Sequence, residues 1–167
     1  MPANIKFIDG GSVTSPQGFS AGATYAGLKT FAEDKLDLAI IASDSPCTAA
    51  GVFTTSTIKS PTVSVNQAHL KAASPKGIIV NAGIANACVG EQGYKDAEEM
   101  ASITANILNA APSEILVCST GVIGVELPMS LIRDGVANIN LSKDGANQVA
   151  RAMMTTDTRT KEAAVTV

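Results

Sequence analysis

Short, nearly continuous apolar runs bounded by glycine, proline, serine or aspartate are the feature that most constrains the fold of this 167-residue chain. Leu38, Ile40 and Ile41 lie in one such run, and residues 78–80 form another. A strand with one face in water alternates apolar and polar residues, whereas a strand covered on both faces is apolar throughout. The runs therefore predict buried strands in a sheet that carries helices on its faces.

The residues between the runs divide the chain into expected elements. Strands are expected at residues 23–28, 36–42, 51–54, 62–65, 77–81 and 115–119. Helices are expected at residues 95–110, before Pro112, at 128–136, which begins with a proline, and after Ser142 as an N-cap. No low-complexity linker or internal repeat divides the sequence, so residues 1–167 are expected to form a single α/β domain.

Composition narrows the classes of ligand and partner. Hydrophobic residues make up 46% of the chain and charged residues 16%, as in a globular protein. The formal net charge of −3 and the lack of Lys or Arg runs disfavour nucleic-acid and anionic-membrane surfaces, and no apolar stretch reaches the length of a membrane span. The three cysteines have neither zinc-site nor disulfide spacing. We therefore expect a cytoplasmic protein with small-molecule ligands, no metal and reduced thiols.

Residues 115–128 (ILVCSTGVIGVELP) combine a strand-like run with an abrupt polar end at Ser119, Thr120 and Gly121. A developing negative oxygen is stabilised by donors already aimed at it, and glycine lets the backbone approach a ligand closely. The Thr120 hydroxyl and the Gly121 N–H are therefore candidate oxyanion donors. The alternative is purely geometric, because glycine-rich turns after strands are common in α/β proteins.

Two other catalytic sets have to be weighed: Cys118 with His69, the only histidine, and the carboxylates Asp96, Glu98 and Glu99. Cys118 ends an apolar run and is expected to be a small buried residue, whereas His69 lies in a polar, helical stretch expected to face solvent. The carboxylates are expected in the first turn of a helix, on its solvated face, where the helix dipole favours them. Neither set is preferred as the catalytic machinery.

The third expected helix leads into Thr155, Thr156, Asp157 and Thr158, which place hydroxyls and a carboxylate at one point of the chain. From residue type alone, such a sequence after a helix satisfies the last carbonyls or starts a turn. Asp157 is expected to order the turn, because no second carboxylate lies near it in the sequence.

Several motifs that occur in a fixed order are more specific than any one of them. In chain order they are AAGVFTT (49–55), IVNAGIANACVG (79–90), CSTGVIG (118–124), ELPM (126–129), MMTTDTRTK (153–161) and KEA (161–163). From about residue 18 to its end, the sequence resembles the N-terminal α part of the ornithine acetyltransferase (glutamate N-acetyltransferase) family of arginine biosynthesis. Ile84 is a departure, since the family usually has a polar NSGNANA-like run there.

The resemblance implies a fold of four layers, α/β/β/α, and a self-cleaving precursor of which this sequence is a truncated α chain. The implied reaction moves acetyl from N-acetylornithine to glutamate by a ping-pong route through the N-terminal Thr of a β part that is absent from this sequence. Thr120 and Gly121 would stabilise the oxyanion, and Thr155 would contact the substrate. No cofactor is implied, although acetyl-CoA is a co-substrate of bifunctional members. The implied assembly is a heterotetramer of two α and two β chains.

The strand-like end of the sequence, residues 161–167, is expected to pair with a segment outside it, because open apolar strands invite association. Because of this open strand and the absent nucleophile, the chain alone is expected to be inactive. Two alternatives stay open: a structural interaction subunit, and a non-enzymatic small-molecule or nucleotide-binding module that uses Gly121 to Gly124 as an anion cradle. That loop lacks a phosphate-binding fingerprint, and Glu126 would repel a phosphate.

Overall fold

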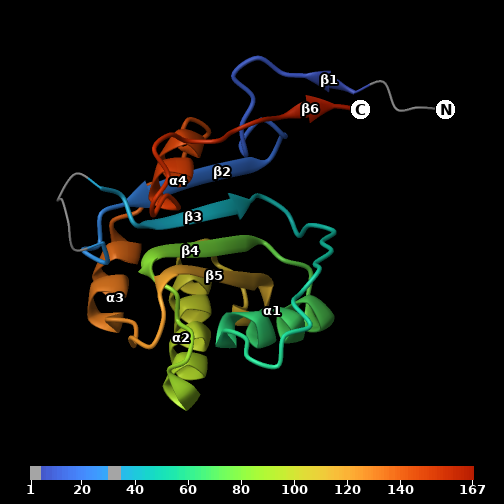
Figure 1. Ribbon diagram of the computed structural model, residues 1–167. Coiled ribbons are helices and arrows are strands. Elements are labelled where there is room, and N and C mark those ends of the chain that lie inside the picture. Colours follow the sequence, from blue (N-terminus) through green and yellow to red (C-terminus); the bar gives the residue numbers. More distant parts are fainter. Residues whose placement is uncertain (1–4, 30–34) are drawn as a thin grey trace.

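A four-stranded mixed sheet, ordered β2-β3-β4-β5, forms the centre of the computed structural model, which describes residues 5–29 and 35–167 (Figure 1). The strands are β2 (Phe19–Thr24), β3 (Leu38–Ser43), β4 (Gly77–Ile84) and β5 (Ile115–Val122). β3 pairs antiparallel with both β2 and β4, and β4 pairs in parallel with β5. The sheet and its helices confirm the expected mixed α/β class.

The two faces of the sheet carry different helices. On one face lie α1 (Pro61–Ala72), α2 (Gly90–Leu108) and α3 (Met129–Ala137), and on the other α4 (Ala146–Ala152) packs against β2 and β3 (Figure 1). A short 3-10 helix, η1 (Pro112–Glu114), leads into β5. A second, two-stranded antiparallel sheet joins β1 (Lys6–Phe7) to β6 (Val165–Thr166).

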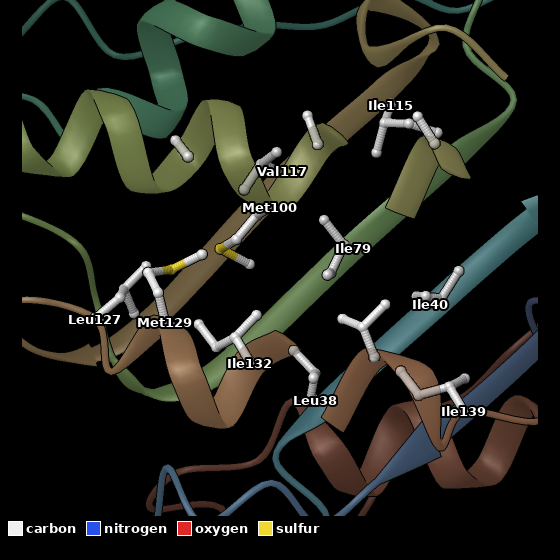
Figure 2. Close-up of a cluster of buried hydrophobic side chains, with 14 of the residues drawn as sticks. Leu38, Ile40, Ile79, Met100, Ile115, Val117, Leu127, Met129, Ile132 and Ile139 are labelled. Atoms are coloured by element: carbon white, nitrogen blue, oxygen red, sulfur yellow. The ribbon is translucent and has the colours of Figure 1, made fainter. Parts of the chain in front are cut away.

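The larger core lies between the sheet and helices α1 to α3. Figure 2 shows Leu38 of β3 and Ile79 of β4 gathered with Met100 of α2 and Ile132 of α3. Each fully buried side chain of this size stabilises the fold by about 1.5–3 kcal/mol relative to an exposed one. The intervening residues Ala39 and Ile41 of β3 face α4 instead, which explains why that run is apolar throughout.

The predicted strands agree with the structure for β3, β4 and β5, and three others were wrong. Residues 62–65 belong to helix α1, because Ser60 caps the helix by accepting the Thr62 N–H and Pro61 occupies its first turn. Residues 51–54 form no strand, and Val52 is fully exposed. The strand expected at 23–28 is displaced to β2.

The helix and terminal predictions were correct in kind and less accurate in their bounds. α2 begins five residues before the expected residue 95, and α4 begins at Ala146 rather than directly after Ser142. Ser142 is not an N-cap, because its backbone N–H and C=O both bond to Ala21 at 2.9 Å. β6 does form in the C-terminal segment and pairs with β1 of the same chain, and the expected pairing with a segment outside the sequence stays a prediction.

Candidate functional site

The carboxyl ends of β4 and β5 meet in a close backbone contact. The parallel register pairs Gly121 with Gly83, and their φ angles are 134° and 118°. A Cβ at Gly121 would lie 2.6 Å from the Ile84 nitrogen and closer still to the Gly83 carbonyl. A Cβ at Gly83 would lie 2.5 Å from the Leu28 oxygen. Both positions therefore require glycine on geometric grounds, because three backbone segments stack there.

Hydrogen bonds hold the loops after β4 and β5 against each other. The Ala85 N–H donates to the Val122 oxygen at 2.8 Å, and the Gly124 N–H donates to the Ala87 oxygen at 2.7 Å. The loop that follows Gly121 is thus tied to the loop after β4. The Gly124 N–H is already used within the protein, which weakens the anion-cradle alternative.

The outer edge of β5 is closed by side chains of α1. Asn66 donates from Nδ2 to the Val117 oxygen and accepts the Val117 N–H at Oδ1, both at 2.8 Å. His69 Nδ1 lies 2.7 Å from the Ile115 oxygen, and since a carbonyl only accepts, this nitrogen is the donor. The amide of Asn66 takes the place of a neighbouring strand and fixes β5 three residues before Thr120. Thr120 and Gly121 belong to the strand itself, so the predicted end of the strand at residue 119 was wrong.

A cavity of about 710 Å³ opens beside these strand ends. It is lined by Leu28, Lys29, Lys35, Leu36, Gly83, Ile84, Gly121, Val122, Val125, Arg151, Met154, Thr155, Thr156 and Asp157. Its volume is in the range of small-molecule sites, and its place at the carboxyl ends of a parallel strand pair is a common one for ligands. Two predicted site residues, Gly121 and Thr155, are therefore brought to one cavity. Ile84 adds an apolar surface there and also packs on the larger core.

Thr120 is adjacent to the cavity but not among its described lining residues. Strand alternation places its side chain on the same face as that of Cys118, opposite to Val117, which lies in the larger core. Thr120 is half-buried. Its role as an oxyanion donor stays a prediction.

The segment after α4 delivers Thr155 to the cavity. The Asp157 carboxylate is paired with Lys161, four residues further on, and this pairing is the main cause that lowers its pKa. The expected role of Asp157 in ordering the turn stays a prediction.

The opposite wall of the cavity comes from residues that the sequence analysis did not single out. Asp37, at the start of β3, is completely buried, and its carboxylate accepts the backbone N–H groups of Ala26 and Leu28 at 2.7 Å and of Lys29 at 3.0 Å. These bonds replace strand pairing after β2 and explain why the strand expected at 23–28 ends early. A carboxylate directly before an apolar strand run was the available signal, because buried carboxylates need several donors.

The structure does not bring Cys118 and His69 together as a nucleophile pair. His69 is half-buried and bonded to β5 from the α1 side, whereas Cys118 lies on the opposite face of the same strand. The expectations for both residues were wrong in detail, since Cys118 is exposed on an edge strand and His69, although helical as expected, is half-buried against β5. Protein atoms around the Cys118 thiol nonetheless raise its pKa by desolvation, which opposes thiolate formation.

Of the three carboxylates expected on the solvated face of α2, Glu98 is exposed as expected, whereas Asp96 and Glu99 differ. Asp96 is only 2% exposed and accepts from Gln92 Nε2 at 2.8 Å, because the helix begins at Gly90 and Asp96 lies a turn further in than predicted. Glu99 forms a bidentate pair with Arg133 of α3 at 2.5 and 3.1 Å. Neither group faces the cavity at the strand ends.

Residues 5–29 and 35–167 contain no group of three or more His, Cys, Asp or Glu side chains placed to hold a metal ion. None of the helices described there combines the length and apolarity that a membrane crossing requires.

The fold and the cavity define a mixed α/β protein with a candidate small-molecule site at the carboxyl ends of two parallel strands. The chain belongs to the ArgJ family, whose family model matches residues 20–167. This result confirms the family expected from the ordered motifs.

Named relatives agree with this assignment. The chain is 47% identical over 167 residues to the arginine biosynthesis bifunctional protein ArgJ of Dehalococcoides mccartyi, covering 100% of this chain and 41% of the relative. It is 44% identical over 156 residues to ArgJ of Symbiobacterium thermophilum, covering 92% of this chain and 39% of the relative. The chain therefore spans about two fifths of the length of these curated relatives.

Solved structures show the same fold. Ornithine acetyltransferase from Mycobacterium tuberculosis, crystallised with ornithine, superposes with a TM-score of 0.91 at 35% identity over 97% of this chain and 88% of that one. ArgJ from Bacillus halodurans gives a TM-score of 0.89 at 34% identity over 95% of this chain and 83% of that one.

Proposed function

We propose that this chain supplies the α part of an ornithine acetyltransferase, which moves acetyl from N-acetylornithine to glutamate in arginine biosynthesis. The observation that carries the proposal is the cavity, because Gly121 and Thr155 reach it from separate parts of the chain. Membership of the ArgJ family and the ornithine complex of the Mycobacterium tuberculosis relative add support.

The proposed chemistry is a ping-pong acetyl transfer. The hydroxyl of an N-terminal Thr, carried on a β part, attacks the acetyl carbonyl of N-acetylornithine and forms a tetrahedral oxyanion. Collapse breaks the amide bond, releases ornithine with a proton on its amine, and leaves an acetyl ester on the Thr. The amine of glutamate then attacks the ester, and N-acetylglutamate leaves as the Thr hydroxyl is restored.

Within that scheme this chain binds and stabilises rather than supplying the nucleophile. The Thr120 hydroxyl and the Gly121 N–H donate to the oxyanion, and one such donor is worth about 3–4 kcal/mol in enzymes where it has been removed. Thr155 donates to the polar atoms of the amino-acid substrate from the other side of the cavity. The stacked glycines keep the Gly121 backbone fixed, which is what a preorganised donor requires.

The finer features of the family are part of the same proposal. They comprise self-cleavage of a precursor into α and β chains, their assembly as a heterotetramer, a cytoplasmic location, and acetyl-CoA as a co-substrate without any bound cofactor. Each concerns the complete protein, of which this chain is about two fifths by comparison with its relatives.

The test is an acetyl-transfer assay on the complete gene product, with N-acetylornithine as donor and glutamate as acceptor. We expect N-acetylglutamate to form at the same rate as ornithine is released. Titration calorimetry with a nucleotide on the same protein provides the contrasting measurement. Nucleotide binding without any acetyl transfer would reject the proposal in favour of a binding module.

A further inference from the structure

Lys29 connects three separate segments at the wall of the cavity. Its Nζ donates to the Leu36 oxygen at 2.9 Å and to the Ala152 oxygen at 2.7 Å. Leu36 lies two residues before β3, and Ala152 is the last residue of α4. A single ammonium group therefore ties the segment after β2 to the entrance of β3 and to the end of a helix that is distant in sequence.

The backbone from which Lys29 reaches across is itself fixed. The Lys29 N–H donates to Asp37 Oδ2 at 3.0 Å, and the same oxygen accepts the Leu28 N–H at 2.7 Å. The Asp37 charge also favours the ammonium form of Lys29, although burial has the larger effect and lowers its pKa. The main chain of Lys29 is thus already fixed, so only its side chain loses conformational freedom when the two bonds form.

The bond to Ala152 is made where α4 most needs a partner. The last carbonyls of a helix have no intrahelical donors, and a cation near that end also complements the helix dipole. α4 has only 7 residues and no side-chain cap at its start. Lys29 therefore acts as a C-terminal cap supplied by a distant segment.

The position of this cap bears directly on the cavity. Thr155 follows Ala152 by three residues, and the intervening turn is held by the Met153 N–H to Val149 and the Met154 N–H to Arg151. The two residues before Thr155 are therefore bonded to the end of α4. Gly121, across the cavity, belongs to the sheet and does not depend on α4.

We propose that Lys29 is a positioning residue that sets the placement of Thr155 relative to Gly121 by fixing the end of α4. The inference rests on the proposed function, because Thr155 is taken there as a substrate contact. It assigns a role in substrate affinity to a lysine whose own donors point at the backbone. Asp37 supports the role by holding the Lys29 main chain.

The experiment compares Lys29→Met with Thr155→Val and the double variant in the complete enzyme. Methionine keeps the length and much of the volume of the side chain but removes both donors. We expect the KM for N-acetylornithine to rise in Lys29→Met by about two- to tenfold and by no more than in Thr155→Val, with kcat within threefold, because the lysine acts through the Thr155 hydroxyl. In the Thr155→Val background the same change is expected to alter KM less than twofold, because no hydroxyl is left to position.

Three results would overturn the inference. The first is an unchanged KM in Lys29→Met. The second is a double variant whose rise in KM equals the product of the two single rises. The third is an equal rise in KM in Lys71→Met, in which an exposed lysine of α1 serves as the control. If Lys29→Met does not fold, Lys29→Arg gives the same comparison with the charge kept and the donors moved. If the wild type is active and Lys29→Met leaves KM unchanged, only this inference is rejected. A wild type without acetyl transfer would reject the proposed function and the inference with it.

Discussion

The two faces of the sheet are built in different ways. The face under α1 to α3 is packed with large side chains, such as Leu38, Ile79 and Met100. The face under α4 is packed with small ones, and Ala21 and Ala39 are completely buried there. Close backbone approach takes the place of apolar bulk: a Cβ at Gly145, before α4, would overlap the Ala21 carbonyl.

Because of this difference, the stability of the fold and the binding of substrate depend on different faces of the sheet. Burial of large aliphatic groups supplies most of the apolar stabilisation, and it lies on the face away from α4. The α4 face gains less from apolar area, so α4 depends more on a few polar contacts, among them the Lys29 bond to Ala152. We therefore expect changes on the first face to alter stability and changes around the cavity to alter activity.

The largest expected effect is the loss of all activity when this chain is assayed alone. The proposed mechanism places the nucleophile on the β part, so neither face of this sheet can complete the reaction. Residues 1–167 should form no N-acetylglutamate, whereas the complete gene product should form it. Sustained acetyl transfer by the isolated chain would mean that a nucleophile lies within it, and Cys118 would then be the first residue to replace.

The next largest effect is expected at Thr120. Valine keeps the shape and β-branching of the side chain and removes only the hydroxyl donor, so the fold should survive. If the hydroxyl meets an oxygen that is charged mainly in the transition state, kcat should fall about 10²–10³-fold with little change in KM. Serine, which restores a hydroxyl, is the matched control.

Self-cleavage of the Thr120→Val precursor has to be followed separately by mass spectrometry. A slower maturation step would lower total activity without any catalytic defect in the mature enzyme. Near-normal kcat in fully processed Thr120→Val would show that the CSTGVIG turn is structural at this position.

The parts of the fold that could be predicted from the sequence are those whose signals lie within a short stretch of the chain. The central strands, α2, α3 and the family were predictable, because apolar runs, helical periodicity and ordered motifs are all local in sequence. Helix α1 was missed although Ser60 and Pro61 signal a helix start, since the β-branched residues after them favour a strand. Sequence alone gave no reason to connect Lys29 with Ala152, because that bond joins segments 123 residues apart.

The residues of the candidate site were likewise predictable only where they belong to local motifs. Gly121 and Thr155 belong to recognisable motifs, and both line the cavity. What the motifs could not show is that Gly121 is also required by contact with Gly83, since that contact arises only when β4 and β5 pair. Asp37 shows the same limit, because its three donors come from a turn that forms around it.

A pair of core truncations tests the contrast between the two faces directly. Ile132→Ala, on the face with large side chains, should lower the free energy of unfolding by about 2–5 kcal/mol and leave KM unchanged. Val149→Ala, on the α4 face, removes less volume and should cost about 2 kcal/mol. Because Thr155 follows the end of α4 by three residues, this second variant should also raise KM.

Denaturant unfolding and steady-state kinetics on the complete enzyme measure both quantities. The contrast between the faces would fail if Ile132→Ala raised KM as much as Val149→Ala does. It would also fail if Val149→Ala lost the greater stability.

The smallest expected effect is that of Thr155→Val. It tests whether removal of a single hydroxyl at the cavity alters activity without altering stability. Thr155 is exposed and follows the end of α4, so the substitution should change the free energy of unfolding by less than about 0.5 kcal/mol. One lost hydrogen bond to substrate is worth about 0.5–1.5 kcal/mol, which corresponds to a rise in KM of about two- to twelvefold with kcat nearly constant. Thr156→Val, at the neighbouring position of the same cavity, shows whether the effect is specific to one hydroxyl. A fall in melting temperature with normal kinetics in the surviving enzyme would make Thr155 a turn residue, and substrate binding would then have to come from the other residues that line the cavity.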